Sequence, residues 1–462
     1  MSYADALSRL LALQRFGVRP GLTAISAALD ALGNPERDFV AIHIAGSNGK
    51  GSTAAMCEAV LRRAGLHVGL YTSPHLSRFT ERIRIRGEEL REELVAGLVD
   101  EVLAVGPELT FFEAVTAVGF LAFSRAHVDL AVVEVGLGGR LDATAVIAKP
   151  LVCVVTGIAL EHTEVLGNTL AAIAREKAGI FRRDVPAVAA ARDEESRAAI
   201  SDVAAQVGAP VAWLGIDFFA AAASSLLGPH QRDNAALAIA ALERLPPELR
   251  PGREAFTALE NVHWPGRLEK IGDDVLLDGA HNADGARALA AALPELACGR
   301  GISLVVGVVE DKDAVGLVAP LLPLVSRIVT TTPKTPRARS AESLATLLKP
   351  AAGERPVEAV PSPIDALLTA RRTGDLTVVA GSLFLVGQLR AHLLGERTDP
   401  VVAQDPPARP LRELSRRTER PKICRARRWR LCFGNASKSA RVDPVRLEFV
   451  IRVRSGRPVR RR

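Results

Sequence analysis

Short apolar runs alternate with stretches of helical periodicity along most of this chain. The runs are bounded by glycine, proline and polar residues, and the stretches between them repeat their apolar residues every three to four positions. This alternation is typical of a parallel sheet covered by helices, so the sequence predicts an α/β fold. The expected strands in the first part of the chain are 39–44, 67–71, 129–135, 151–155 and 185–189.

The pattern starts again after Pro265-Gly266-Arg267, which places a domain boundary near residue 270. We expect residues 1–268 to form a first parallel-sheet domain and residues 269–398 to form a smaller Rossmann-like α/β domain. A ligand is expected in the cleft between them, outside the carboxyl ends of the strands. In the second domain the expected strands are 275–277, 302–308, 327–331 and 376–380, and the expected helices are 283–293, 340–348 and 363–371.

Composition indicates a soluble globular protein of 462 residues, of which 48% are hydrophobic and 24% charged. No apolar run is long enough to cross a bilayer, and residues 1–13 do not resemble a signal peptide. The five cysteines lie far apart and lack metal-site spacing, so we expect a reduced, cytoplasmic location.

The net charge of +7 is unevenly distributed. Residues 401–462 carry 19 Lys and Arg against 5 Asp and Glu, a net +14, which leaves 40 against 47, a net −7, for residues 1–400. We therefore expect residues 399–462 to be a basic, disordered tail, and we do not expect nucleic acid as a partner of the acidic body. The tail itself is compatible with a solvated extension, a translated artefact, or electrostatic contact with RNA or membranes.

A glycine-rich segment follows the first expected strand. Residues 44–52 read Ile-Ala-Gly-Ser-Asn-Gly-Lys-Gly-Ser and precede a helix-like stretch at 53–64. Glycine amides and a helix N-terminus can surround phosphate oxygens, Lys50 adds a positive charge, and the Ser52 hydroxyl can reach a magnesium ion. The segment predicts a nucleoside triphosphate site, although Gly51 interrupts the common P-loop pattern and an ordinary glycine turn is the alternative.

Polar residues follow three other expected strands. Ser73 comes after strand 67–71, Glu134 ends an apolar strand and precedes glycines, and His162 follows strand 151–155. Since buried carboxylates are costly and Mg²⁺ prefers oxygen ligands beside phosphate, Glu134 favours a magnesium site over a structural ion pair. A capped turn at Ser73 and a structural hydrogen bond of His162 remain alternatives.

Four further residues have weaker signals. Lys177 lies in the last turn of an expected helix that ends at Gly179, where the helix dipole alone can explain a basic residue. Arg267 could reach a triphosphate from the domain junction, as arginines do in phosphoryl transfer. Asp278 suits a ribose hydroxyl, with helix capping as the alternative, and His281 has no unique role.

These segments together resemble the folylpolyglutamate synthase and dihydrofolate synthase family, within the Mur ligases. The resemblance extends over about residues 1–395. It rests on His-Ile-Ala-Gly-Ser-Asn-Gly-Lys-Gly-Ser (43–52), Tyr-Thr-Ser-Pro-His-Leu (71–76), Thr-Phe-Phe-Glu (110–113), Glu-Val-Gly-Leu-Gly-Gly-Arg-Leu-Asp-Ala-Thr (134–144), His-Thr-Glu (162–164), Glu-Lys-Ala-Gly-Ile (176–180), Pro-Gly-Arg-Leu-Glu (265–269) and Asp-Gly-Ala-His-Asn (278–282).

The resemblance implies ATP-dependent joining of L-glutamate to dihydropteroate or to folates through an acyl phosphate, with ADP and phosphate as products. It implies a Mur-ligase-like ATP domain with a folate pocket, a C-terminal glutamate-ligase domain, two magnesium sites and a monomer. By resemblance the phosphates of ATP are held by Gly49, Lys50, Gly51 and Ser52, and other parts of ATP by Asn234, Arg267 and Asp278. The resemblance assigns magnesium to Ser73, Glu134 and His162. It assigns the pteroate to Thr110, Phe111, Phe112, Glu113 and Leu141, and glutamate to His281 and Ser382.

The resemblance also assigns Lys177 a chemical role, because the matching lysine in similar enzymes is carbamylated and becomes an anionic metal ligand. Lys50, Lys177, Arg267 and His281 are thus the expected catalytic residues. Glu161 departs from the family pattern, which usually has aspartate there, and the tail has no counterpart in it. Another Mur-type amino-acid ligase is the nearest alternative function.

Overall fold

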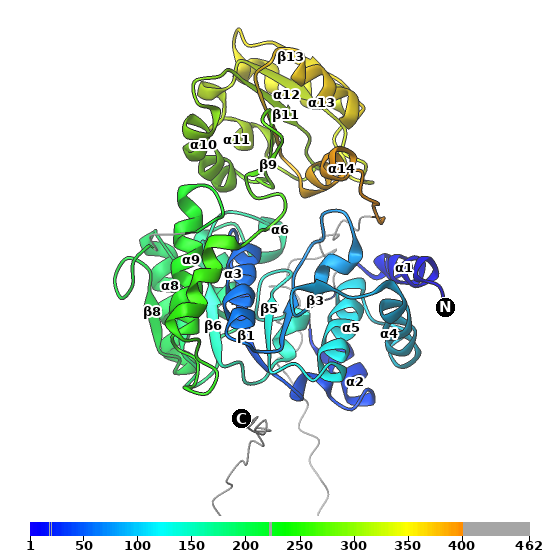
Figure 1. Cartoon of the computed structure of the whole chain (residues 1–462), viewed down its shortest axis with the longest axis vertical. Coiled ribbons are helices and arrows are strands. Elements are labelled where there is room, and N and C mark those ends of the chain that lie inside the picture. Colours follow the sequence, from blue (N-terminus) through cyan, green and yellow to red (C-terminus); the bar gives the residue numbers. More distant parts are fainter. Residues whose placement is uncertain (18, 20, 221–223, 401–462) are drawn as a thin grey trace, which may run out of the picture. The chain divides into compact units, whose positions relative to one another are not determined.

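The computed structural model describes residues 1–17, 19, 21–220 and 224–400 (Figure 1). The predicted tail lies outside these residues except for its first two positions. Asp399 is bound to the body, since its carboxylate accepts hydrogen bonds from the Tyr3 hydroxyl at 2.6 Å and the Phe79 amide at 2.9 Å. No described helix combines the length and apolar character that a membrane span requires.

The first sheet has eight strands, of which the six from β2 to the β8 edge are parallel. The antiparallel strands β3 and β4 extend one edge. In spatial order the strands are β4 (Glu88–Glu89), β3 (Ile83–Ile85), β2 (Val68–Tyr71), β5 (Leu130–Glu134), β1 (Val40–Ala45), β6 (Val152–Val155), β7 (Ala187–Ala189) and β8 (Val211–Trp213).

Helices cover both faces of this sheet because successive strand residues point to opposite sides. Ile42 and Ile44 of β1 pack in the core formed with α3 (Lys50–Arg63) and α9 (Pro229–Leu242), whereas Ala41 packs in the core on the other face. That second face is covered by α1 (Tyr3–Ala12), α2 (Thr23–Ala31), α4 (Glu92–Val105), α5 (Phe111–Arg125), α7 (Leu170–Ala178) and α8 (Glu194–Val207), and the short α6 (Thr163–Leu166) precedes α7.

The second sheet has six strands, parallel except for the edge strand β9. In spatial order they are β13 (Val357–Ala359), β12 (Arg327–Thr330), β11 (Ile302–Val306), β14 (Leu376–Ala380), β10 (Val275–Leu277) and β9 (Glu269–Ile271). One face carries α10 (Ala283–Ala297), α11 (Ala314–Val318) and α12 (Ala341–Ala352), and the other carries α13 (Pro363–Arg371) and α14 (Leu383–Leu394).

The predicted α/β class is confirmed, and every predicted strand is present within one or two residues of its expected bounds. Sequence analysis missed β3, β4, β8, β9 and β13, which have at most three residues each and lie at or near sheet edges. Such strands are too short to display a period. The helices ending at 293 and 348 were predicted too short, because α10 and α12 each continue through a proline into their last turn.

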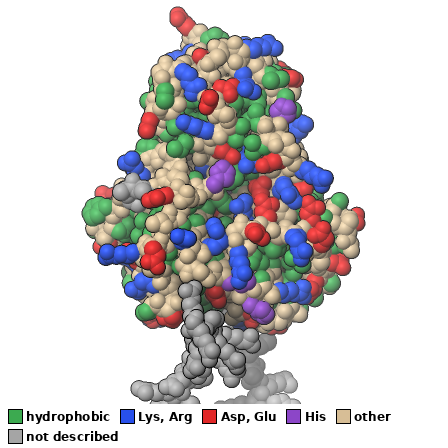
Figure 2. Space-filling view, in the orientation of Figure 1, with side chains coloured by type: hydrophobic (Ala, Val, Ile, Leu, Met, Phe, Trp, Pro, Cys, Tyr) green, Lys and Arg blue, Asp and Glu red, His purple; other side chains and the backbone are tan. Residues whose placement is uncertain are grey.

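The surface of the described residues mixes charges of both signs. Lys and Arg side chains are interspersed with Asp and Glu on the face shown in Figure 2. This mixture is typical of a solvated surface.

Candidate functional site

The glycine-rich segment forms a tight loop between β1 and α3. Gly46 has φ +147°, and a Cβ atom there would lie 1.8 Å from the Thr156 hydroxyl oxygen, so only glycine fits. Lys50 is the first residue of α3, and its ammonium group donates to the carbonyl oxygens of Gly46 at 2.8 Å and Ser47 at 3.1 Å. The loop thus holds a cation and a helix N-terminus together, as a phosphate group requires.

Two other glycines of the loop allow close approach of residues from elsewhere. A Cβ atom on Gly49 would lie 2.3 Å from the Asn234 amide oxygen of α9, and one on Gly51 would lie 2.9 Å from the indole nitrogen of Trp264. Gly51, which interrupts the common P-loop pattern, is therefore needed to admit Trp264. No sequence pattern indicated this contact.

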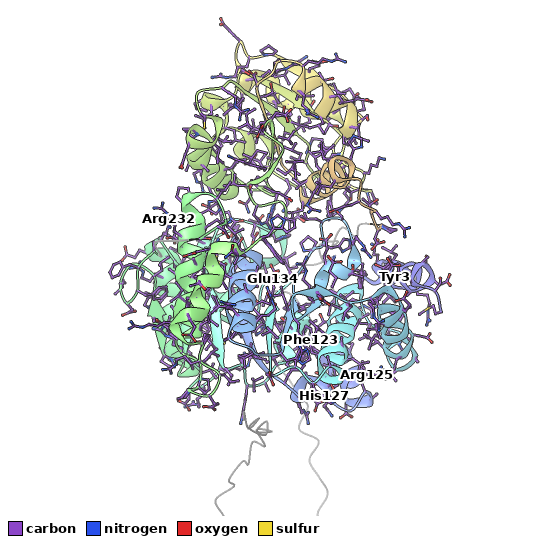
Figure 3. The ribbon with its side chains drawn as sticks, viewed as in Figure 1. Tyr3, Phe123, Arg125, His127, Glu134 and Arg232 are labelled. Carbon is purple, nitrogen blue, oxygen red and sulfur yellow. The ribbon has the colours of Figure 1, made fainter. Side chains whose placement is uncertain are left out.

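Glu134 ends β5 next to the phosphate loop, and Figure 3 marks its position within the first sheet. Its carboxylate accepts a hydrogen bond from the Ser73 amide at 3.2 Å and from no other group among the described residues. Burial raises the pKa of this carboxyl, while Lys50, the Ser73 amide and Arg267 oppose the rise. Cations thus surround a carboxylate whose remaining oxygen is available to a ligand.

The loops around Glu134 are held in place by two acidic residues, Asp142 and Glu81, to which sequence analysis assigned no role. The Asp142 carboxylate accepts from the amides of Gly136 at 3.1 Å and Leu137 at 2.9 Å, which directly follow β5. Glu81 accepts from three successive amides, at residues 76–78, in the loop that begins at Ser73. Both are carboxylates within or just after quoted motifs, and that position was the only sequence signal available.

Lys177 is buried, and this overturns its explanation by the helix dipole. Its ammonium group donates to the Gly46 carbonyl oxygen at 2.8 Å and to the Glu161 carboxylate at 2.8 Å. Burial lowers the pKa of Lys177, and Lys50 lowers it further against the opposing effect of Glu161. Burial would raise the pKa of Glu161, but Lys177, Lys50 and His162 hold it well below its usual range. Lys177 and Glu161 thus form a buried ion pair next to the phosphate loop.

His162 follows Glu161 in a left-handed backbone conformation, with φ 47°. Burial lowers the pKa of its ring to about 4, although Glu161 acts in the opposite direction. The ring is therefore neutral at pH 7, as a metal-binding imidazole must be. It makes no hydrogen bond within the part of the chain that the structure describes, so the predicted structural hydrogen bond is not seen.

The loops next to the second sheet contribute Arg267, which precedes β9, and Asp278 and His281, which follow β10. Asp278 accepts hydrogen bonds from the amides of Leu268 and Ala280, both at 2.9 Å, and α10 is capped by Asn282 instead, so the capping interpretation of Asp278 is wrong. Burial raises the pKa of Asp278, with Arg267 opposing.

The His281 ring has a defined tautomer. Nδ1 lies 2.8 Å from the Gly279 carbonyl oxygen, which can only accept, so Nδ1 carries the hydrogen and Nε2 keeps a lone pair. Burial lowers the pKa of the ring to about 4, with Lys312 acting in the same direction. At neutral pH His281 can therefore accept a proton or a hydrogen bond at Nε2.

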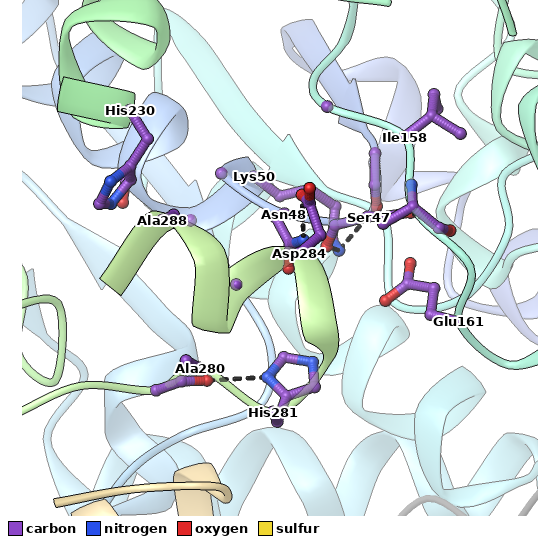
Figure 4. A pocket seen from close by; sticks show the side chains of 18 of the residues that line it. Ser47, Asn48, Lys50, Ile158, Glu161, His230, Ala280, His281, Asp284 and Ala288 are labelled. Atoms are coloured by element: carbon purple, nitrogen blue, oxygen red, sulfur yellow. Dashed lines mark hydrogen bonds between the residues drawn. The ribbon is translucent and has the colours of Figure 1, made fainter. Parts of the chain in front are cut away.

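One cavity of about 1150 Å³ brings these side chains together. Figure 4 shows part of its lining, with Lys50 of the phosphate loop, Glu161 and His281 around it. Among the predicted site residues, those that line the cavity are Gly49, Lys50, Gly51, Ser52, Ser73, Glu134, His162, Lys177, Asn234, Arg267, Asp278, His281 and Ser382. The hydroxyl of Ser382 also caps α14 by accepting from the Phe384 amide at 3.2 Å.

The predicted pteroate residues lie outside the lining of this cavity. Thr110 and Glu113 form a capping box at the start of α5, in which the Glu113 carboxylate accepts from the Thr110 amide at 2.9 Å and hydroxyl at 2.8 Å. Phe111 lies under the Arg82 guanidinium, Phe112 packs on Gly136, and Leu141 packs beside α6 and α7. The capping box gives two of these five residues a structural role, and their substrate role stays a prediction.

Comparisons with known proteins agree with this arrangement. The Mur ligase middle domain matches residues 44–217, and the glutamate ligase domain of Mur ligases matches residues 266–383. The dihydrofolate synthase/folylpolyglutamate synthase of Bacillus subtilis is 33% identical over 431 residues, which cover 85% of this chain and 99% of that protein. This chain belongs to the dihydrofolate synthase/folylpolyglutamate synthase family of Mur ligases.

Other members of the family extend the comparison. The probable bifunctional folylpolyglutamate synthase/dihydropteroate synthase of Halobacterium salinarum is 40% identical over 427 residues; the match covers 85% of this chain and only 52% of that protein, so this chain spans about half its length. The bifunctional folylpolyglutamate synthase/dihydrofolate synthase of Yersinia pestis, solved with AMPPNP and a manganese ion, has a TM-score of 0.76 and 32% identity, covering 85% of this chain and 98% of that one.

Proposed function

We propose that this chain is an ATP-dependent ligase that joins L-glutamate to dihydropteroate, to the γ-carboxyl group of folates, or to both. The observation that carries the proposal is that one cavity is lined by the phosphate loop, by Glu134 and His162 at the rim of the first sheet, and by His281 in the loop after β10. Phosphate-binding, anion-stabilising and proton-accepting groups thus converge in one space, as a carboxylate–amine ligase requires.

In the proposed reaction an oxygen of the substrate carboxylate attacks the γ-phosphorus of ATP, and ADP leaves. The amine of glutamate then attacks the carbonyl carbon of the acyl phosphate, loses a proton and displaces phosphate. The substrates carry several negative charges, so we assign Lys50 and Arg267 to hold them in line and to offset the charge that develops. His281 Nε2 is the group available to accept the amine proton.

The donor set fits a divalent cation, which would offset the charge of the phosphates and hold their oxygens in line. The Yersinia pestis relative was solved with manganese. The Glu134 carboxylate, the Ser73 hydroxyl and the His162 ring all line the cavity, and the latter two groups make no hydrogen bond within the described residues. No three His, Cys, Asp or Glu side chains among those residues group closely enough to hold a metal alone, so phosphate oxygens and water would complete the coordination. We propose two magnesium sites on these ligands.

We further propose that Lys177 is carbamylated in the working enzyme. Its buried amine has a lowered pKa, which favours the neutral nucleophile that reacts with CO₂. The nitrogen bonds to the carbon of CO₂ and loses a proton, which leaves an anionic oxygen donor beside the phosphate loop. Because this product would repel Glu161, we expect it to persist only with a divalent cation bound.

We propose the division into an ATP-binding domain (1–268), a glutamate-ligase domain (269–398) and a tail (399–462), in a monomeric cytoplasmic enzyme. The start of β9 at Glu269 and the unpaired state of the three described cysteines support this reading. The pteroate pocket is proposed to lie near Phe112 and Leu141.

A steady-state assay tests the central proposal. We expect purified chain to release ADP from ATP in the presence of Mg²⁺, L-glutamate and either dihydropteroate or tetrahydrofolate, with a glutamylated product detectable by mass. Omission of glutamate should abolish product. ADP release with a UDP-sugar peptide and amino acid, and none with either pterin substrate, would reject the proposal in favour of another Mur-type ligase.

A further inference from the structure

Two asparagines without an assigned role join the phosphate loop to the second sheet. The Asn48 amide nitrogen donates to the Asn282 amide oxygen at 3.2 Å, and the Asn282 amide nitrogen donates back to the Asn48 oxygen at 3.1 Å. The Asn48 nitrogen also donates to the Asp284 carboxylate at 3.1 Å. Figure 4 shows Asn48 and Asp284 near the phosphate loop, with the hydrogen bond between them dashed. We name these three residues the asparagine clasp.

Each side of the clasp is held firmly by its own sheet. Asn48 belongs to a loop whose backbone pairs with Gly157, since the Ser47 amide donates to the Gly157 carbonyl oxygen at 2.8 Å. Asn282 caps α10 by accepting from the Gly285 amide at 2.8 Å. Neither asparagine can therefore move without also moving the phosphate loop or the start of α10.

The clasp also fixes the position of groups next to it in sequence. Asn282 directly follows His281 and lies four residues after Asp278, and both of these line the cavity. Asn48 lies two residues before Lys50, which also lines it. The clasp thus sets the distance between the phosphate loop of one sheet and the proton-accepting loop of the other.

We propose that Asn48 and Asn282 are positioning residues. The two hydrogen bonds between their side-chain amides hold the 278–282 loop at a fixed position relative to the phosphate loop, so that the glutamate amine meets the acyl phosphate. This inference rests on the proposed ligase function and adds residues to it. Amides suit the task because each supplies one donor and one acceptor, and because neutral groups do not compete with Lys50 for phosphate. Arg287 binds the other oxygen of Asp284 at 3.3 Å and orients it toward Asn48.

Asn282→Ser is the informative variant, since Asn282 itself does not line the cavity. Serine retains the N-cap of α10 but is too short to reach Asn48. The substitution removes two hydrogen bonds, each of modest net value, so we expect kcat/KM for ligation to fall about tenfold. Asn261→Ser, at an exposed asparagine outside the cavity, is the matched control and should leave ligation and the thermal midpoint unchanged.

A double-mutant cycle separates the clasp from two independent effects. Asn48→Ser should cost at least as much as Asn282→Ser, because Asn48 also loses its bond to Asp284. The double variant should be no worse than Asn48→Ser alone, because the bond is already lost. Losses that multiply in the double variant, or an Asn282→Ser enzyme as active as wild type, would overturn the proposal.

A distance measurement supplies a readout that a merely local defect would not change. One spin label goes on the exposed Cys298 at the end of α10 and another on Lys149→Cys in the loop before β6, with Cys424 and Cys432 replaced by serine. We expect one narrow distance distribution for the otherwise wild-type chain and a broader or shifted one for Asn282→Ser. Slower ligation with an unchanged distribution would assign the asparagines a role other than positioning.

The experiments distinguish a failure of the proposed ligase function from a failure of the asparagine clasp. If the wild-type chain ligates neither pterin substrate, the proposed function is wrong, while the distance distributions still test the clasp. If wild type ligates and the clasp variants match it, only the clasp is wrong.

Discussion

Lys177 and Glu161 form a buried ion pair that lines the cavity. The two side chains are 3% and 5% exposed, and their charged atoms lie 2.8 Å apart. Glu161→Gln keeps the size of the side chain and an acceptor oxygen but removes the charge. Lys177 is then left as a buried cation with only neutral acceptors, which are the Gly46 carbonyl oxygen and the amide oxygen at position 161.

The loss is expected to be large because an uncompensated buried charge costs more than the pair contributes. Removing one partner of a buried pair costs about 3–5 kcal/mol, whereas removing both often costs nothing. For a folding unit of this size, about 2 °C of thermal midpoint corresponds to each kcal/mol. We therefore expect Glu161→Gln to lower the midpoint by about 6–10 °C. Lys177→Met should be similarly unstable, and the double variant should return close to wild type.

Thermal unfolding of the three variants in CO₂-depleted buffer with EDTA measures these effects on the unmodified lysine. Glu101→Gln is the control, since its partner Arg125 is exposed and the pair should contribute less than about 1 kcal/mol. Single-variant losses that simply add in the double variant would refute the reasoning, as would a Glu161→Gln midpoint equal to that of the control. Neither Lys177→Met variant should ligate if the proposed role of Lys177 is correct.

Four further predictions address other parts of the chain. Gly46→Ala should abolish nucleotide binding in a fluorescent-nucleotide titration, because the added Cβ atom would overlap the Thr156 hydroxyl. In the control Gly97→Ala, in α4, the added Cβ atom would have no atom within 4 Å, and this variant should bind nucleotide normally. Equal affinities of the two variants would contradict the prediction. Burial lowers the pKa of His43 from 6.5 to about 3, so between these values the unfolded state binds a proton that the folded state does not. The free energy of unfolding therefore falls as the pH drops from 6.5 toward 3, by about 1.4 kcal/mol per pH unit for this histidine. His43→Gln should reduce that slope between pH 6.5 and 5 in urea unfolding, and an unchanged slope would contradict the burial argument. Arg267→Met should lower kcat about 100-fold or more while the fold, followed by circular dichroism, is retained. A chain ending at residue 400 should keep most of its ligase activity, since the cavity lining lies within the described residues; its inactivity would assign the tail a function.

Much of the site follows from local sequence. A strand followed by glycines and a lysine specifies the phosphate loop, and Glu134 and His162 reach the same rim because Glu134 ends one parallel strand and His162 follows another. The carboxyl ends of parallel strands share one edge, so residues far apart in the chain converge there without knowledge of any contact. For the same reason the order of strand and helix patterns was sufficient to predict the fold class.

Contacts across the chain were decided only by the tertiary structure. The indole of Trp264 lies against Gly51, the Lys177 ammonium group pairs with the Glu161 carboxylate, and Asn48 bonds to Asn282, which follows a strand of the other sheet. Periodicity describes which face of an element is buried, but it does not encode which side chain lies opposite. The sequence by itself therefore determined the longer strands and the rim on which the chemistry lies, whereas packing of the two sheets determined the short edge strands and which polar groups meet at the rim.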